Sequence, residues 1–272
     1  MKTREQEIFG ITGKRHNLPL SAISTLGVLP MFYFKLRYGA ALFLGAVIAL
    51  AGIILWARED NAVPVSASEE KRVSVVVLDA GHGGADGGTV GRAGTLEKDL
   101  NLEIALLTRE FCDILGVETI LTRETDISLG EGESLRQQKI NDLKARVGLV
   151  RSLGSVALIS IHQNYYDDFA SRGAQVFYDP ENQWGEALAV RMQCRLKEYC
   201  DSSNKRQAMP LPNDNYLLEN LACPAIIVEC GFLSHLEEEM LLNSPGYRER
   251  LAFCLAAQAF ECVSTGIEPV LK

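Results

Sequence analysis

The chain has 272 residues, of which 47% are hydrophobic and 23% charged, and its formal net charge is −8. These proportions are typical of globular proteins and exclude a collagen-like, low-complexity or wholly disordered chain. Because the chain is acidic and has no basic stripe, we expect no nucleic-acid partner. The charge is divided unevenly, since residues 1–58 carry a net +5 and residues 59–272 a net −13.

The strongest N-terminal signal is a run of twenty uncharged residues at 38–57. As a helix rising about 1.5 Å per residue, this run would span about 30 Å, which matches the apolar core of a bilayer. A buried core helix would normally keep a polar face, and a cleaved signal peptide would have a shorter apolar region. Lys35 and Arg37 precede the run, so the positive-inside rule predicts a cytoplasmic N-terminus.

We therefore expect a membrane-anchored protein whose folded domain lies on the extracytoplasmic side. The polar, unpatterned segment after the anchor is typical of a tether. The expected parts are a cytoplasmic N-terminal segment at 1–37, a transmembrane signal anchor at 38–57, a linker at 58–72 and a folded domain at 73–265.

Strand and helix patterns alternate through the folded domain. Mostly apolar, β-branched runs predict buried strands, at 74–79, 117–123, 155–162, 174–178 and 225–230. Helical patterns, with apolar residues at steps of three and four, lie at 98–115, 135–153, 184–199 and 247–263. In the second helix the expected apolar face consists of Ile140, Leu143, Val147 and Val150. This alternation indicates an α/β fold with a largely parallel sheet, whose sites form at the carboxyl edge.

The folded domain contains seven cysteines, an odd number, and no C-x-x-C motif, so neither a zinc knuckle nor a disulfide framework is indicated. Cys194 and Cys200 would lie about 9 Å apart along one helix, too far for a disulfide. We interpret most of the seven as small buried apolar side chains. Seven thiols in an exported domain fit a reducing or anaerobic setting better than an oxidising one.

Three predicted strands end in residues that bind metals or carry protons. The first runs into His82, the third ends at His162, and the strand at 225–230 contains Glu229, while Glu97 precedes the first helix. Two imidazoles and one carboxylate are a common ligand set for catalytic zinc. A second carboxylate is then needed to take the proton of the attacking water, and Glu229 is the candidate.

Each of these residues also has a structural interpretation. His82 lies among glycines, and its structural alternative is a histidine in a turn. The alternative for His162 is a hydrogen-bonded core histidine. Glu97 would favour a helix N-terminus through the helix dipole. Asp99 or Glu103 would replace Glu97 as the ligand in an alternative version of the zinc site.

Other chemistries fit the sequence less well. Asp86 occupies the last glycine position of a dinucleotide-binding loop, and the P-loop, G-x-S-x-G and H-E-x-x-H motifs do not occur. Cys230 would be a nucleophile if it met His162 or His235. A cysteine in a strand is more often buried filler, and we expect His235 at the surface.

Four separated motifs, DAGHGGADGG, LEKDLNLEIA, SIHQN and PAIIVECGFLSH, carry a family resemblance over about residues 74–263. Their order and spacing resemble the zinc-dependent N-acetylmuramoyl-L-alanine amidases of the amidase-3 type. The resemblance implies that Zn²⁺ is held by His82, Glu97 and His162, and that Glu229 is the catalytic acid/base. It also implies a mixed six-stranded sheet flanked by helices. The implied reaction is hydrolysis of the peptidoglycan amide that joins N-acetylmuramic acid to L-alanine.

A narrower resemblance lies at 134–146, which is similar to the germination-specific branch acting on spore-cortex peptidoglycan. We therefore expect a role in cell-wall or spore-cortex remodelling, with any activating protein partner unidentified. The anchor lies farther from Met1 than a simple signal peptide would, and the cysteine content is unexplained. Two alternatives remain: a zinc peptidase that cuts within the stem peptide, and a non-catalytic wall-binding protein of amidase descent.

The acidity of the exported domain raises a question about substrate binding, because stem peptides carry carboxylates. We expect positive charge to be concentrated near the zinc, with the metal supplying much of it. Arg92 is the best side-chain candidate, since it lies between His82 and Glu97 in the chain. The alternative is a solvated loop arginine. Asn164, in the SIHQN motif, is the second residue that we expect to bind substrate.

Overall fold

The computed structural model describes residues 73–154, 156–212 and 215–269. The predicted cytoplasmic segment, transmembrane anchor and linker at 1–72 lie outside the described residues. Within the described ranges, no helix combines the length and the apolar character that a bilayer crossing requires.

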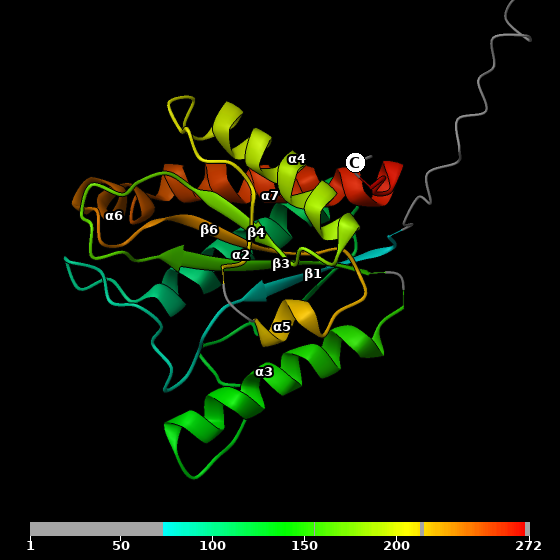
Figure 1. Cartoon of the computed structure of the whole chain (residues 1–272), viewed down its shortest axis with the longest axis horizontal. Helices are drawn as coiled ribbons and strands as arrows, with labels where there is room; N and C mark the ends of the chain where they lie inside the picture. Colours follow the sequence, from blue (N-terminus) through cyan, green and yellow to red (C-terminus); the bar gives the residue numbers. More distant parts are fainter. Residues whose placement is uncertain (1–72, 155, 213–214, 270–272) are drawn as a thin grey trace, which may run out of the picture. The chain divides into compact units, whose positions relative to one another are not determined.

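A mixed six-stranded sheet forms the centre of the domain, in the order β2-β1-β3-β6-β4-β5 (Figure 1). The strands are β1 (Val75–Ala80), β2 (Thr119–Leu121), β3 (Val156–Asn164), β4 (Gln175–Tyr178), β5 (Met209–Pro210) and β6 (Ala225–Phe232). The β4–β6 pairing is antiparallel, and the other four pairings are parallel. The predicted α/β fold with a mixed, largely parallel sheet is confirmed.

Helices cover both faces of this sheet. They are α2 (Glu97–Leu115), α3 (Leu135–Ser152), α4 (Gln183–Tyr199), α5 (Tyr216–Glu219), α6 (Leu236–Leu242) and α7 (Pro245–Thr265). In Figure 1, α2, α4 and α7 lie on one face, and α3 and α5 lie on the other. The larger cluster of buried apolar side chains lies under α2, α4 and α7, and a smaller one lies under α3 and α5.

Side-chain alternation along the strands explains both the buried sheet and the position of the polar residues. In β1, Val76 and Leu78 belong to the larger apolar cluster, and Val77 belongs to the smaller one. The period of two then places Asp79 on the same face as Val77. Toward the carboxyl edge, the face under α3 therefore changes from apolar to polar.

Three short elements were absent from the sequence prediction: β5, α5 and α6, of two, four and seven residues. Each is too short to show a period in the sequence. The apolar face predicted for α3 is only half covered, because Val147 and Val150 are buried but Ile140 and Leu143 are 39% and 36% exposed. The prediction that most cysteines are buried is confirmed for four of the seven, Cys112, Cys230, Cys254 and Cys262.

Candidate active site

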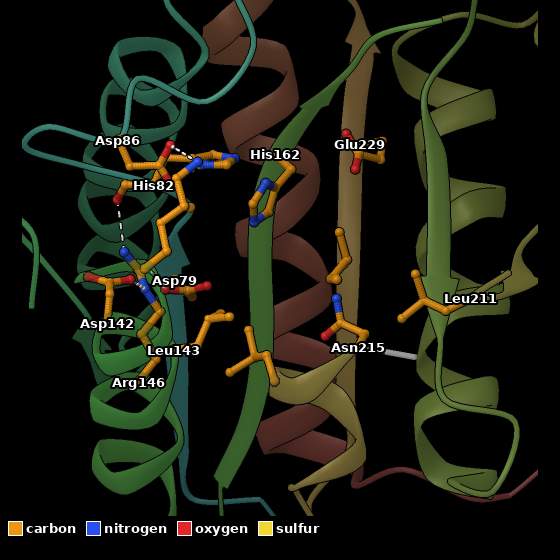
Figure 2. Close-up of a pocket in the computed structure, with 14 residues that line it drawn as sticks. Asp79, His82, Asp86, Asp142, Leu143, Arg146, His162, Leu211, Asn215 and Glu229 are labelled. Atoms are coloured by element: carbon orange, nitrogen blue, oxygen red, sulfur yellow. Dashed lines mark hydrogen bonds and ion pairs between the residues drawn. The ribbon is translucent and has the colours of Figure 1, made fainter. Parts of the chain in front are cut away.

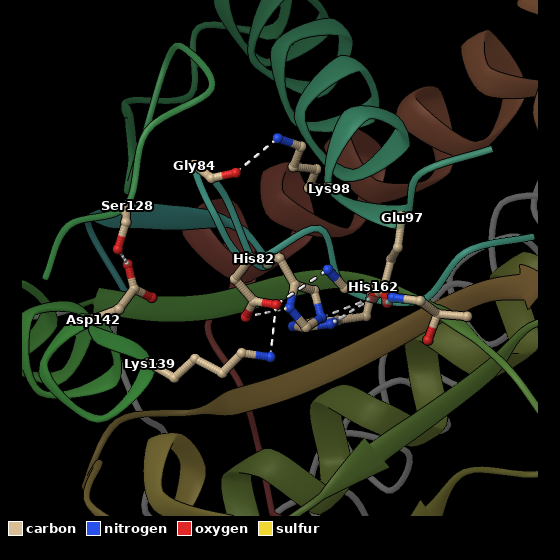
Figure 3. A network of polar contacts seen from close by, with 12 residues as sticks. His82, Gly84, Glu97, Lys98, Ser128, Lys139, Asp142 and His162 are labelled. Carbon is tan, nitrogen blue, oxygen red and sulfur yellow. Dashed lines mark hydrogen bonds and ion pairs between the residues drawn. The ribbon is translucent and has the colours of Figure 1, made fainter. Parts of the chain in front are cut away.

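Three side chains that the sequence singled out meet at the carboxyl edge of the sheet (Figure 3). His82 follows β1, Glu97 begins α2 and His162 lies near the end of β3. Glu97 Oε1 lies 3.2 Å from His82 Nε2 and 3.0 Å from His162 Nδ1, and one ligand atom from each residue lies within 4.8 Å of the others. Tetrahedral zinc with ligand bonds of about 2.0–2.1 Å separates its ligand atoms by roughly 3.3 Å. The three residues therefore fit a zinc ion.

The two other carboxylates that the sequence left open as ligands do not take part in this cluster. Within the described part of the chain, the group of possible metal ligands comprises His82, Glu97 and His162. Glu103 instead forms an ion pair of 2.9 Å with Arg248.

The charges within the cluster of His82, Glu97 and His162 compensate one another. Burial opposes ionisation of Glu97, but hydrogen bonds from His162 and His82 hold the pKa of its carboxyl well below the usual range. Burial alone would lower the pKa of His82, whereas the hydrogen bond to Glu97 and the neighbouring charges raise it to about 9. A zinc ion bound here would compete with protons for the histidine nitrogens, so its binding would be coupled to proton release.

A carboxylate behind His82 orients its ring. Asp86 Oδ2 lies 2.9 Å from His82 Nδ1, which leaves Nε2 to face Glu97. Lys139 in turn lies 2.7 Å from the other oxygen of Asp86. Partners of this kind fix the tautomer of a ligand histidine. The sequence analysis did not predict this contact, and the only sequence feature that indicates it is the spacing of four residues between His82 and Asp86.

The backbone at His82 has an unfavourable conformation that its surroundings hold in place. His82 has φ of +63°, the one positive value among the described non-glycine residues. Arg146 donates to the carbonyl oxygens of Ala80 and His82 at 2.9 and 2.8 Å. Arg123 donates to those of Ala80 and Gly81 at 2.9 and 3.1 Å. Such strain costs about 1–3 kcal/mol and persists only where neighbouring contacts determine it.

The glycine before His82 is required by close packing. A Cβ atom at Gly81 would lie 2.3 Å from two atoms of the His162 ring. The backbone of one ligand loop therefore contacts the side chain of another ligand directly. Any side chain at this position would displace the His162 ring.

A buried ion pair lies directly under the metal cluster. Arg146 and Asp79 are 2% and 1% exposed, and they form a hydrogen-bonded salt bridge. Asp79 also accepts hydrogen bonds from Thr122 at 2.7 Å and from Ser160 at 2.6 Å. Burial raises the pKa of Asp79, but the positive charge of Arg146 and the hydrogen bonds from Ser160 and Thr122 together outweigh this effect and lower it. The sequence analysis did not predict this network, because the local sequence around Arg146 does not show whether its side chain is solvated or buried.

A second buried carboxylate holds the loop that leads into Glu97. Glu239 in α6 is fully buried and accepts hydrogen bonds from the backbone N–H groups of Ala93 and Thr95. Thr89 donates its own N–H to Glu97 Oε2 at 2.8 Å. The position of Glu97 thus depends on a helix that the sequence patterns did not predict.

Glu229 lies beside the cluster, opposite His162 in the register of β3 and β6. Its Oε2 is buried and has no hydrogen-bond partner in the described structure. Burial raises the pKa of Glu229 to about 7, with His162 and His82 acting in the opposite direction and Glu97 adding to the rise. A buried carboxylate oxygen without a partner is costly unless a ligand or a water approaches it.

A cleft of about 360 Å³ opens from Glu229 and the histidines toward the gap between α3 and α5 (Figure 2). Asp142, Leu143 and Arg146 form one wall, and Leu211 and Asn215 form the other. This volume is within the range of small-molecule sites. The cleft therefore offers both apolar and charged contacts next to the metal cluster.

The two predicted substrate-binding residues lie outside the lining of this cleft. The Arg92 guanidinium stacks 4.6 Å from the centre of the Phe169 ring. The Asn164 carbonyl accepts a hydrogen bond of 2.8 Å from the Leu233 N–H. Their roles in substrate binding stay predictions.

The other two residues considered from the sequence have structural surroundings. His235 is the N-cap of α6, and its side chain accepts a hydrogen bond from the Glu238 N–H. Cys230 is fully buried, and burial strongly raises the pKa of its thiol. A buried thiol of this kind is a poor nucleophile.

Comparisons with known proteins identify the family to which the chain belongs. The sequence pattern of the family described as N-acetylmuramoyl-L-alanine amidase (Amidase_3) matches residues 76–258. The germination-specific N-acetylmuramoyl-L-alanine amidase of Bacillus subtilis is 36% identical over 180 residues, which cover 65% of this chain and 75% of that protein. The matched family region includes all three cluster residues and Glu229.

Two solved structures are similar as well. The CwlD amidase of Clostridioides difficile, determined in complex with the GerS lipoprotein, is 36% identical with a TM-score of 0.66. The match covers 70% of this chain and 100% of that one. The amidase AmiC2 of Nostoc punctiforme is 28% identical with a TM-score of 0.57, over 69% of this chain and 95% of that one.

Gly81→Ala should weaken zinc binding about 10- to 100-fold, because the new methyl group displaces the His162 ring. Competition against a chromogenic zinc chelator measures the affinity. Gly87→Ala is the matched control in the same loop, since its Cβ would meet only Leu96 at an ordinary 3.7 Å. Equal affinities for the two variants would contradict the close packing of Gly81 on His162.

Arg146→Gln should lower the free energy of unfolding by about 3–5 kcal/mol, because Asp79 is left as an unpaired buried charge. Urea denaturation of the purified protein measures the change. The control is Arg151, which lies on the same helix as Arg146 and makes an exposed hydrogen bond to Asn220. Arg151→Gln should lower the free energy of unfolding by less than about 1 kcal/mol. Similar losses in both variants would refute a special role for the buried pair.

Glu229 should make the stability of the metal-free protein depend on pH. Its pKa is about 7 in the folded domain against a usual 4.5, so the stability it contributes is present below pH 4.5. That stability is lost as the pH rises through about 7. Glu229→Gln should therefore gain up to about 3 kcal/mol over the unmodified protein between pH 4.5 and 8. Denaturant unfolding of both proteins, with a chelator present and at a series of pH values, measures the difference in free energy of unfolding. A difference that does not change with pH would contradict the raised pKa of Glu229.

Proposed function

This chain belongs to the Amidase_3 family of N-acetylmuramoyl-L-alanine amidases, and we propose on that premise that His82, Glu97 and His162 hold a catalytic zinc ion. Its activity is hydrolysis of the peptidoglycan amide between N-acetylmuramic acid and L-alanine. The observation that carries the proposal is the convergence of the three ligand atoms beside the partnerless Oε2 of Glu229.

Glu229 moves the proton in the proposed reaction. When bound, zinc would polarise the amide carbonyl and lower the pKa of the attacking water. Glu229 accepts a proton from that water and donates it to the departing nitrogen of L-alanine. A C–O bond forms as the C–N bond breaks, which yields a lactyl carboxylate and a free amine. With its pKa raised to about 7 by burial, Glu229 is suited to both transfers near neutral pH.

The remaining residues orient the reacting groups. Asp86 keeps Nδ1 of His82 hydrogen-bonded, so Nε2 stays directed at the ligand site. We assign the cleft beside Glu229 to the substrate, whose aliphatic parts would contact Leu143 and Leu211. Arg92 remains our candidate for the substrate carboxylates, at the rim of this edge rather than in the cleft.

The biological setting that we propose is the spore cortex. The support is the similarity to a germination-specific amidase of Bacillus subtilis. A similar amidase of Clostridioides difficile was solved with a lipoprotein bound, and we extend to this chain the expectation of an activating protein partner.

Digestion of defined muropeptides tests the activity and separates it from the alternatives. Free lactyl carboxylate with intact stem peptides, detected by mass spectrometry and abolished by a chelator, is the expected result. Cleavage within the stem would indicate a zinc peptidase, and the absence of any product would indicate a wall-binding protein. Glu229→Gln should retain zinc and lose about 10²–10⁴-fold in kcat, whereas His82→Ala should lose zinc itself.

We further propose that residues 38–57 anchor the protein in the membrane with the catalytic domain at 73–265 outside. The support is the twenty-residue uncharged run and the basic residues before it. Alkaline carbonate extraction should leave the protein in the membrane pellet, and protease added to protoplasts should remove the domain. Release of the full chain by carbonate would contradict the anchor.

A further inference from the structure

Two of the seven cysteine side chains lie in contact with each other. Cys200 Sγ and Cys254 Sγ are 3.4 Å apart, although the residues are separated by 54 positions in the sequence. Cys200 is the C-cap of α4, and Cys254 lies within α7. Contact between thiols from two different helices is a tertiary feature that no local motif indicates.

We propose that Cys200 and Cys254 are a modification site that closes to a disulfide when it meets a disulfide oxidant. A disulfide bond is about 2.05 Å long, so the sulfur atoms must approach by only about 1.4 Å. Cys200 has room for this movement because it ends its helix, and the residues after it leave the helical path. Rotation of one side chain and a small shift of the helix end supply it.

The two thiols differ in access, as a two-step exchange requires. Cys200 is partly exposed, whereas Cys254 is only 1% exposed. The hydrogen bond between the two thiols lowers the pKa of Cys254, with burial opposing and Arg195 and Arg250 adding to the decrease, and it raises the pKa of Cys200, with burial adding to the rise. Access and not acidity therefore sets the order: Cys200 is the sulfur that an external disulfide reaches, and Cys254, 3.4 Å away, is the sulfur positioned to complete the bond.

The reaction is balanced with one oxidant of named class, a small-molecule disulfide or a thiol–disulfide oxidoreductase. The Cys200 sulfur attacks the oxidant's disulfide, forms a mixed disulfide and releases the first thiol. The Cys254 sulfur then attacks the Cys200 sulfur, forms the internal bond and releases the second thiol. The two protons of the cysteine thiols go to the two released thiolates, and the oxidant's disulfide is reduced as the protein's is formed.

The bond would close a loop that contains Glu229 and one wall of the cleft. Residues 201–253 include β5, α5, β6 and α6, and thus Glu229 together with the cleft residues Leu211 and Asn215. Linking the ends of this segment restricts the unfolded chain and stabilises the folded domain. The expected effect is a rise in Tm of roughly 5–10 °C on oxidation.

The test uses the full-length protein in detergent, reduced, desalted and then incubated with oxidised glutathione. Remaining thiols are alkylated after denaturation, and peptide mapping locates the bonds. We expect a cross-linked peptide pair containing Cys200 and Cys254, together with the rise in Tm. Cys200→Ser and Cys254→Ser should abolish that rise, whereas Cys194→Ser, at an exposed thiol of the same helix, should retain it.

Two outcomes would overturn the site. In the first, Cys254 is recovered alkylated, and Cys200 is recovered either as a stable glutathione adduct or alkylated. The other is an unchanged rise in Tm in Cys200→Ser, which would assign the effect to other thiols. Peptide mapping of the unsubstituted protein decides the question even if Cys254→Ser fails to fold. None of these measurements depends on amide hydrolysis, so they are independent of the proposed function.

Discussion

The buried ion pair between Asp79 and Arg146 is the interaction on which the geometry of the site depends. Two desolvated charges are tolerated only when their remaining donors and acceptors are satisfied. Here Asp79 also accepts hydrogen bonds from Ser160 and Thr122. Arg146 also donates hydrogen bonds to the carbonyl oxygens of Ala80 and His82, the residues on either side of Gly81. The pair therefore joins α3 to the ends of two strands and to the loop that carries His82. Its loss would remove contacts from both the helix and the strained loop.

The metal cluster is organised by contacts from outside it. His82, Glu97 and His162 come from three separate segments, and each is held by groups that do not themselves reach the ligand site. Asp86 orients His82, and the backbone N–H of Gln163 donates to Glu97 at 3.1 Å. Such contacts would leave little of the free energy of binding a cation to be spent on ordering the ligands.

The same chemical group performs two different tasks at this site because its surroundings differ. Glu97 receives hydrogen bonds from two histidines and from the backbone N–H groups of Thr89 and Gln163, and these hold the pKa of its carboxyl well below the usual range. Glu229 has a buried Oε2 without a hydrogen-bond partner, and desolvation raises its pKa to about 7. One carboxylate is thus suited to hold a cation and the other to exchange a proton, a division of roles that burial and hydrogen bonding produce.

The sequence by itself determined the alternation of strands and helices, because a strand covered on both faces and an amphipathic helix each leave a local periodic pattern. It also singled out the histidines and carboxylates at strand ends, since parallel strands bring their carboxyl ends to one edge. Only the tertiary structure decided which buried partners those residues have. Arg146 and Asp79 are 67 positions apart, and a charged residue on a helix has the same local pattern whether it is solvated or buried. The same limit applies to Glu239 and to the Cys200–Cys254 contact: long-range packing brings these groups together, and no period of two or 3.6 residues encodes it.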